Sequence, residues 1–92
     1  MKELVITSKF KKDYKAFKHN KAVESELREV IGLLMEETSL PVKYKDHPLI
    51  GEFLGCRDCH LFPDVVLIYE ITSEEVRLIR IGKHSNLFGQ KI

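Results

Sequence analysis

The chain has little of what marks a secreted, membrane-spanning or disulfide-stabilised protein. Its 92 residues include no tryptophan, two cysteines, three prolines and five glycines. No run approaches the roughly 18 apolar residues that a membrane helix needs, and the start of the chain lacks the long apolar stretch of an export signal. We therefore expect a cytoplasmic protein that spans no membrane, in which both thiols are reduced and no disulfide supports the fold.

Length and composition predict one folded unit. A chain this short cannot bury enough apolar surface for two separate cores, so residues 1–92 should form a single domain. The composition, 43% hydrophobic and 32% charged, is that of an ordinary globular protein rather than a disordered chain.

The formal net charge of +1 conceals an uneven distribution along the chain. Residues 1–21 contain seven lysines and two acidic residues, residues 22–40 contain one arginine and five glutamates, and the remainder is balanced. A basic first segment suits a polyanionic partner, but a solvated, lysine-rich helix face explains it equally well. The lysines concerned are Lys9, Lys11, Lys12, Lys15 and Lys18.

The first half of the chain predicts a strand followed by two helices. Residues 4–7 are apolar and β-branched, as in a strand, and Ser8 can cap a following helix over residues 9–20. Apolar residues recur at helical spacing in that helix and in a second one over about residues 23–37. The two helices should form a hairpin whose apolar stripes belong to the core.

The second half predicts a loop and three strands. Prolines and glycines interrupt residues 38–55, which should form a loop with at most short ordered pieces. Strand patterns follow at about 56–61, 65–71 and 75–82, joined by connections short enough for hairpins. The predicted fold class is α+β, in the order β-α-α-β-β-β, with the helical hairpin packed on one face of a mainly antiparallel sheet.

Three of the four histidines lie at the ends of predicted elements. His47 is in the loop, His60 is near the end of one strand and His84 follows the last strand. Imidazole titrates near neutral pH, so it can act as a general base or a general acid. RNA carries its own nucleophile in the 2'-hydroxyl beside each phosphate, so a base and an acid can cleave it without a metal ion. Each histidine alone could equally be an ordinary surface residue.

Two charged residues extend this candidate site. Asp64 follows His60 across a short turn, which can bring both side chains to the same rim of the sheet. Arg80 lies among apolar residues near the end of the last predicted strand, and a buried guanidinium needs an anion from the protein or from a ligand. Arginine can hold phosphate oxygens as negative charge develops on them.

The segment from Cys56 to His60 matches the C-x-x-C-H pattern of c-type haem attachment, and the same residues could be drawn as a zinc site. Positions three apart in a strand point to opposite faces, so Cys56 and Cys59 are not expected to share one ligand. No second C-x-x-C pair is present. We expect neither haem nor any metal or other cofactor.

Several motifs together resemble the YafQ branch of the RelE-type toxins, in the RelE/ParE superfamily. They span nearly the whole chain in matching order and spacing, and they are Tyr44-Lys45-Asp46-His47-Pro48-Leu49, Arg57-Asp58-Cys59-His60, Pro63-Asp64, Leu67-Ile68-Tyr69 and Arg80-Ile81-Gly82-Lys83-His84-Ser85-Asn86-Leu87-Phe88. The resemblance implies a RelE-like fold. It also implies the toxin of a type II toxin-antitoxin pair, an mRNA interferase that cleaves mRNA in the ribosomal A site and leaves a 2',3'-cyclic phosphate and a 5'-hydroxyl.

By matching position, the resemblance assigns roles to particular residues. The acid and base candidates fall on His47, His60 and His84, and which is acid and which is base stays open. The acidic residue after the hairpin proline is Asp64, and the phosphate-binding arginine is Arg80. Phe88 and Lys45 would contact the substrate. One departure is Val65, where some relatives have tryptophan, so a role for that ring in holding mRNA is in doubt.

The resemblance also implies partners. These are a cognate antitoxin, the ribosome with its mRNA, and operator DNA reached only through the antitoxin complex. The lysine-rich first helix would then contact ribosomal RNA. Two alternatives remain: a catalytically inactive RelE-fold module that acts with an antitoxin in operon repression, and a nonspecific RNA-binding domain, which would leave the histidines unexplained.

Overall fold

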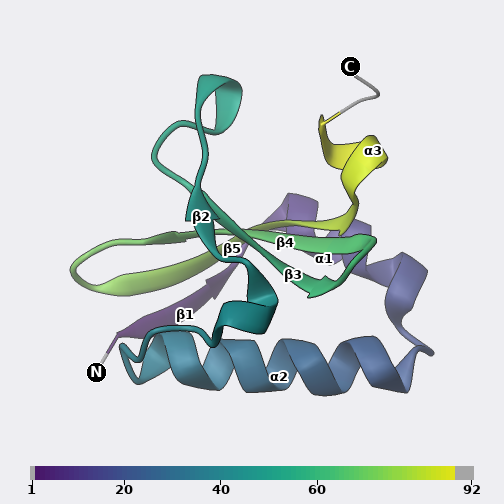
Figure 1. The fold of residues 1–92 in the computed structure, drawn as a ribbon, viewed down its shortest axis with the longest axis horizontal. Coiled ribbons are helices and arrows are strands. Elements are labelled where there is room, and N and C mark those ends of the chain that lie inside the picture. Colours follow the sequence, from purple (N-terminus) through teal and green to yellow (C-terminus); the bar gives the residue numbers. More distant parts are fainter. Residues whose placement is uncertain (1, 89–92) are drawn as a thin grey trace.

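The computed structural model describes residues 2–88, so the ends of the predicted domain, residue 1 and residues 89–92, lie outside the described part. A five-stranded sheet in the order β1-β5-β4-β3-β2 forms its centre. Helix α2 lies across one face of this sheet, while the loop after β2 and helix α3 rise from the other face (Figure 1). The strands are β1 (Glu3–Ile6), β2 (His47–Pro48), β3 (Arg57–Phe62), β4 (Val65–Ile71) and β5 (Glu75–Lys83).

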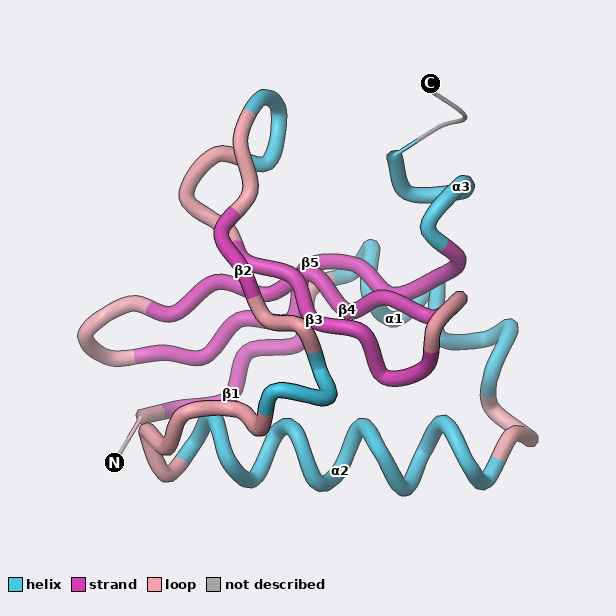
Figure 2. The backbone as a smooth tube through the Cα atoms, viewed as in Figure 1, coloured by secondary structure: helices cyan, strands magenta, loops and turns pink. Residues whose placement is uncertain are grey.

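The predicted hairpins β3-β4 and β4-β5 are confirmed as antiparallel pairs, and β1 joins the sheet parallel to β5. This pairing places the first strand beside the last, although the helices and the strands β2, β3 and β4 separate the two in sequence. The short β2 pairs with β3 at the opposite edge, at the base of the projecting loop (Figure 2). It is one of the short ordered pieces allowed within residues 38–55.

The helices begin and end at slightly different residues from those predicted. Thr7, not Ser8, caps α1 (Ser8–Tyr14), because its hydroxyl oxygen accepts a hydrogen bond from the Phe10 amide. The O–H of the same group donates to the Leu78 carbonyl of β5. The chain continues as a 3-10 turn, η1 (Lys15–Phe17), so α1 is shorter than the predicted helix. Asn20 then caps α2 (Lys21–Met35), its side chain accepting from the Val23 amide.

The main core lies between the sheet and α2, on what we call the helix face. The apolar stripe predicted for the first helix belongs to it, because Phe10 is buried in this core and Tyr14 and Phe17 pack against it. Alternate residues of β3, β4 and β5 point into this core, as the strand period requires. Its buried members are Phe10, Val23, Leu27, Val30, Leu34, Tyr44, Cys59, Leu61, Val65, Leu67, Tyr69, Val76, Leu78 and Ile81.

The opposite side of the sheet, which we call the open face, holds a smaller apolar cluster. Val66 and Ile68 of β4 are fully buried there beneath residues of the projecting loop and α3 (His84–Phe88). Gly82 of β5 allows this covering, because Leu87 packs 3.4 Å from the position that a Cβ atom would occupy. Helix α3 is therefore folded back onto the sheet, an element that the sequence did not predict.

Among residues 2–88, no helix has the length and apolar character needed to cross a membrane.

Candidate active site

Strand register aligns the predicted site residues in two rows across the open face. In one row, His47 pairs with Asp58, Asp58 with Ile68, and Ile68 with Arg80. In the next row, His60 pairs with Val66, and Val66 with Gly82. Directly paired residues of antiparallel strands project from the same face of a sheet. The sheet itself therefore gathers residues that lie far apart in the sequence.

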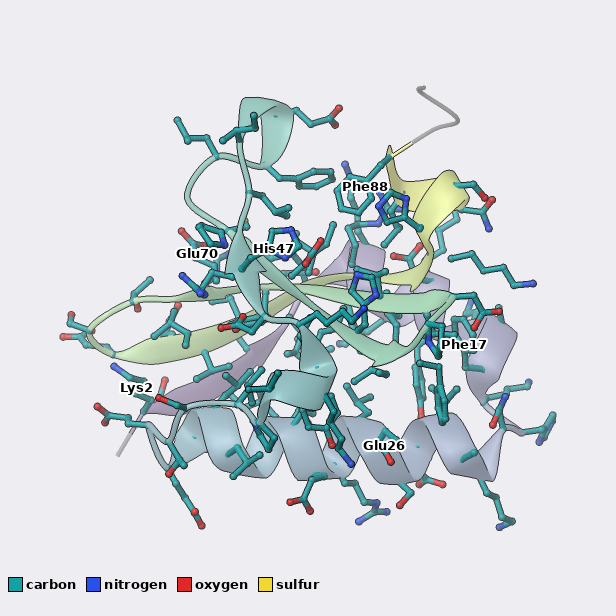
Figure 3. The ribbon with its side chains drawn as sticks, viewed as in Figure 1. Lys2, Phe17, Glu26, His47, Glu70 and Phe88 are labelled. Carbon is teal, nitrogen blue, oxygen red and sulfur yellow. The ribbon has the colours of Figure 1, made fainter. Side chains whose placement is uncertain are left out.

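The three predicted histidines are brought together on this face. The His60 and His84 rings lie 6.5 Å apart between centroids, and the His84 ring lies 4.7 Å from that of Phe88. Phe53, from the 3-10 turn η3 (Gly51–Phe53) in the projecting loop, meets Phe88 edge to face at 5.8 Å. Figure 3 shows His47 and Phe88 on the same side of the sheet, opposite α2. A continuous row of rings thus runs from the loop to β3.

Asp58 lies at the centre of this group and was missed as a site residue. Its side chain is only 2% exposed, and Nδ1 of His47 lies 3.1 Å from its Oδ1. Burial raises the Asp58 pKa, while nearby His47, His60 and His84 act to lower it. Among the described residues, Oδ1 has no hydrogen-bond partner, so the approach of His47 is a close polar contact rather than a directed hydrogen bond. The signal was available in the sequence, since Asp58 and His60 alternate along one strand and so share a face.

The orientation of the His47 ring follows from its two neighbours. Nδ1 lies 3.1 Å from the Lys45 carbonyl oxygen, which can accept a hydrogen bond from it, and 3.1 Å from Asp58. Both neighbours present oxygen atoms, so the ring proton belongs on Nδ1 in the neutral tautomer. Nε2 is then left as the atom that can accept or donate a proton, and the ring is half-exposed.

A second aspartate holds the backbone that carries His47. Asp46 accepts hydrogen bonds from the Arg57 guanidinium, the shortest being 2.9 Å, and from the Tyr69 hydroxyl. Tyr69 is buried in the core of the helix face, and Lys45 has a left-handed backbone that turns the chain toward the network. The end of the loop that bears His47 is therefore fixed to the sheet through contacts on the helix face.

Arg80 finds its anion within the protein. Its Nε and Nη2 atoms donate to Asp13 of α1 at 2.6 and 3.0 Å, and the Ile81 amide donates to the same carboxylate at 3.1 Å. The bond to Asp13 is the main reason why the Arg80 pKa is raised. No ring contact or hydrogen bond among residues 2–88 joins Arg80 to the histidines. The partner is 67 positions away in sequence, so no local pattern could have named it.

The other predicted residues are more dispersed. Asp64 is exposed in the turn between β3 and β4, and no ion pair within the described range includes it. Lys45 is exposed and lines a hollow that His60 also lines. Val65, where some relatives have tryptophan, is buried on the helix face. The five lysines between residues 9 and 18 are all exposed.

The two cysteines lie on opposite faces, as strand geometry predicted. Cys59 is buried in the core of the helix face, whereas Cys56 packs with the apolar cluster of the open face. Burial raises the pKa of the Cys59 thiol to about 12, so it stays protonated at neutral pH. Within residues 2–88, no three histidine, cysteine or acidic side chains are grouped so that they could hold a metal ion.

Comparisons with known proteins agree with the fold and with the motifs. A family described as "Bacterial toxin of type II toxin-antitoxin system, YafQ" matches residues 2–89. The mRNA interferase toxin YafQ of Escherichia coli K12 is 37% identical over 89 residues, which cover 96% of this chain and 97% of that protein.

Solved structures give the same picture. The crystal structure of the E. coli DinJ-YafQ complex matches with a TM-score of 0.86 at 36% identity, over 97% of this chain and 100% of that one. A metal-bound toxin from Helicobacter pylori matches with a TM-score of 0.86 at 41% identity, over 96% and 100% of the two chains. The resemblance and the RelE-like fold expected from the sequence are confirmed. The chain belongs to the YafQ family of toxins of bacterial type II toxin-antitoxin systems.

Proposed function

We propose that this protein is an endoribonuclease that cleaves mRNA in the ribosomal A site by metal-independent acid-base catalysis. The observation that supports this most is the meeting of His47, His60 and His84, from three separate segments, around the buried Asp58. A related protein is named an mRNA interferase, and this name supports the same substrate class.

The reaction needs one base and one acid. A neutral imidazole takes the proton from the 2'-hydroxyl, whose oxygen then bonds to the adjacent phosphorus. The bond from phosphorus to the 5'-oxygen breaks, and a protonated imidazole gives its proton to that leaving oxygen. The products are a 2',3'-cyclic phosphate and a 5'-hydroxyl. Asp58 assists by holding the His47 ring and by stabilising a neighbouring imidazolium.

The remaining predicted residues have supporting roles. Arg80 stabilises charge on the phosphate through Nη1, because Asp13 occupies its Nε and Nη2 atoms. Phe88 stacks on a base beside His84, and Lys45 contacts the RNA backbone near His60. Asp64 lies at the rim, where it can contact the RNA or help a histidine exchange protons.

We also propose the partners that the toxin class implies. A cognate antitoxin holds the enzyme inactive, and the solved DinJ-YafQ complex of the E. coli relative supports such a partner. Operator DNA is reached only through that antitoxin complex. A subset of the exposed lysines Lys9, Lys11, Lys12, Lys15 and Lys18 provides positive charge for contact with ribosomal RNA.

The test is to add purified protein to translating ribosomes and to map the ends of the mRNA. We expect cleavage within the A-site codon by the unmutated protein, with strong loss in His60→Ala, Arg80→Ala and His84→Ala. His19→Ala is the matched control, because His19 is exposed at the end of the first helical segment, away from the site. Its activity should equal that of the unmutated protein.

Three outcomes would overturn parts of this proposal. Intact mRNA would favour an inactive module that represses transcription with an antitoxin. Equal cleavage of free and ribosome-bound RNA would remove the A-site requirement. Loss of cleavage in a chelator, with the ribosomes shown to be intact, would overturn metal independence, a point raised by the metal-bound H. pylori relative.

A further inference from the structure

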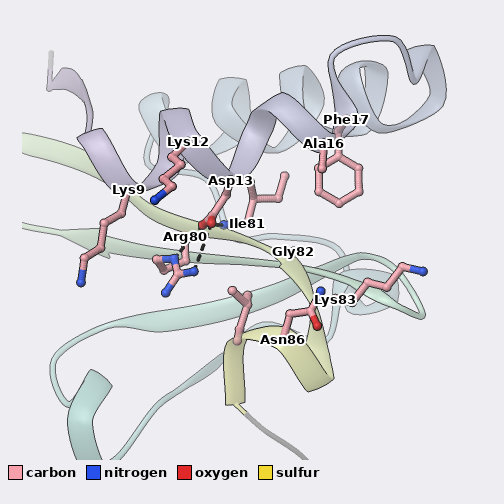
Figure 4. A pocket seen from close by; sticks show the side chains of 11 residues that line it. Lys9, Lys12, Asp13, Ala16, Phe17, Arg80, Ile81, Gly82, Lys83 and Asn86 are labelled. Atoms are coloured by element: carbon pink, nitrogen blue, oxygen red, sulfur yellow. Dashed lines mark hydrogen bonds and ion pairs between the residues drawn. The ribbon is translucent and has the colours of Figure 1, made fainter.

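A cleft between α1 and α3 lies beside the histidine group, and of its lining residues only Arg80, with its partner Asp13, has a role in the chemistry described above. We call it the α1–α3 cleft, and its volume is about 590 Å³. Figure 4 shows Lys9 and Lys12 of α1 pointing toward the same side as the Arg80 guanidinium, with Asn86 of α3 across from them. The lining residues are Lys9, Lys12, Asp13, Ala16, Phe17, Arg80, Ile81, Gly82, Lys83, Asn86 and Leu87.

The charge of this cleft is strongly positive. Three lysines and Arg80 line it against a single acidic side chain, Asp13. Both carboxylate oxygens of Asp13 are already engaged by Arg80 and by the Ile81 amide. Lys9, Lys12 and Lys83 are in no ion pair with another residue of the described range. The cleft therefore has three cations that the fold itself does not use.

Part of the cleft lining is apolar. Phe17, Ile81 and Leu87 line the cleft together with the charged residues. An inorganic anion needs only the charges, whereas a nucleotide presents a charged phosphate together with an apolar sugar edge and base face. This combination of lysine and arginine cations, the Asn86 amide and apolar side chains fits a nucleotide of a single strand.

The cleft also lies within reach of the histidine group. Helix α3 contributes to both places. Its His84 and Phe88 belong to the row of rings, and its Asn86 and Leu87 line the cleft. Along the sheet row, Asp58 and Arg80 are two strands apart, which corresponds to roughly 10 Å. One extended RNA strand can therefore contact both places.

The structure divides the basic first segment into two surfaces. Lys9 and Lys12 line the α1–α3 cleft, whereas Lys15 and Lys18 line a separate shallow surface with His19 and Lys21. We propose that the α1–α3 cleft is a second phosphate subsite, which binds the phosphodiester and sugar of a nucleotide that flanks the cleaved bond of the substrate strand. This assignment rests on the proposed ribonuclease function and names where its substrate lies.

The experiment measures binding of an oligodeoxyribonucleotide, which cannot be cleaved because it lacks the 2'-hydroxyl, and of empty and mRNA-programmed ribosomes. The variants are Lys9→Gln/Lys12→Gln and Lys83→Gln. The matched control is Lys15→Gln/Lys18→Gln, which removes the same charge from the neighbouring surface. Thermal unfolding of each variant shows that the fold is intact.

We expect the Lys9→Gln/Lys12→Gln variant to bind the oligonucleotide on the order of 10-fold more weakly at low salt. The slope of the logarithm of the binding constant against the logarithm of the salt concentration should be smaller in magnitude by about 0.7 for each phosphate that the variant no longer neutralises. The control should bind the oligonucleotide within a few-fold of the unmutated protein, whereas its affinity for ribosomes can fall, because Lys15 and Lys18 are among the candidates for contact with ribosomal RNA. On ribosomes, the cleft variants should lose more affinity when mRNA is present than when it is absent.

Equal losses for cleft and control variants would overturn the subsite, because the lysines would then act only as diffuse charge. Equal losses on empty and programmed ribosomes would assign the phosphate to ribosomal RNA instead of the substrate. The two proposals fail in different ways. If the unmutated protein cleaved no mRNA, the proposed function would be wrong. If it cleaved mRNA and the cleft variants cleaved and bound it equally well, only the subsite would be wrong.

Discussion

Two aspartates on opposite sides of the sheet show how differently its two faces are built. Asp46, at the edge of the helix face, is paired with Arg57 and with the Tyr69 hydroxyl. Asp58, on the open face, is more deeply buried, yet its Oδ1 has no hydrogen-bond partner among the described residues. Asp46 precedes His47 in the sequence and Asp58 pairs with it in the sheet. Only Asp46 has hydrogen-bond partners for both of its carboxylate oxygens.

The difference indicates what each face is for. A buried carboxylate without a good partner lowers stability, and such groups are retained mainly where chemistry requires them. Asp58 is surrounded by three histidines that contribute little to either core. The helix face therefore supplies stability, and the cost in stability at Asp58 on the open face agrees with the reaction proposed there.

The largest expected effect is on the reaction, and it comes from the rings of the open face. Changing His60 or His84 to alanine should lower the rate of mRNA cleavage by about 10²–10⁴-fold, because an acid or a base is lost. The free energy of unfolding should stay within about 0.5 kcal/mol of the unmutated value, since neither residue is in the main core. Single-turnover cleavage and urea unfolding measure the two quantities. A parallel fall in both would mean that these rings serve the fold.

The next largest effect is on the stability of the fold, and it comes from Asp46, the aspartate that has hydrogen-bond partners. Asp46→Asn should lower the free energy of unfolding by about 1–3 kcal/mol, because Arg57 loses its anion and the Tyr69 hydroxyl loses a charged acceptor. The value should lie at the lower end, since Arg57 is 40% exposed and water can replace part of the contact. Urea unfolding at neutral pH measures it. No loss would show that the network contributes nothing to stability, which would weaken the comparison.

The smallest expected effect is on the free energy of unfolding of Asp58→Asn, which should not fall as it does in Asp46→Asn. Its pKa is raised in the folded protein, mainly by burial, so the folded state binds this proton more tightly than the unfolded state. Stability from this group is therefore present at low pH and is lost as pH rises above the ordinary value of 3.8 toward the raised one. Asp58→Asn should remove that decline and leave the protein at least as stable at pH 7.

Unfolding of both proteins, followed from pH 3 to pH 8, tests this sign. If Asp58→Asn were less stable than the unmutated protein at neutral pH, the carboxylate would be a stabilising partner of the histidines rather than a cost.

The sequence predicted the framework of the molecule better than its site. The strands after residue 55 were predictable because β4 alternates between two buried faces and is bounded by short turns. The fold-back of α3 was not, because it depends on Leu87 meeting Gly82, a contact that no periodicity reveals. The parallel pairing of β1 with β5 was not predictable either, because the two strands lie about 70 residues apart in the sequence.

The histidines could be named from their motifs, but the charges around them could not. Asp13 reaches Arg80 across 67 positions, so its role is visible only in three dimensions. Asp58 could have been found, since it alternates with His60 on one strand, but it also lies between two cysteines whose spacing suggests a metal or haem pattern. Phe53 was hidden in a segment that predicted only a loop.

The most direct test of the open face as a catalytic centre is the chemistry of the ends that it leaves. RNA fragments from ribosome-bound mRNA should carry a 2',3'-cyclic phosphate and a 5'-hydroxyl, both in the presence and in the absence of a chelator. The His60→Ala/His84→Ala double variant should produce neither end. Fragments with a 3'-hydroxyl and a 5'-phosphate, or cleavage that survives loss of both rings, would contradict the account.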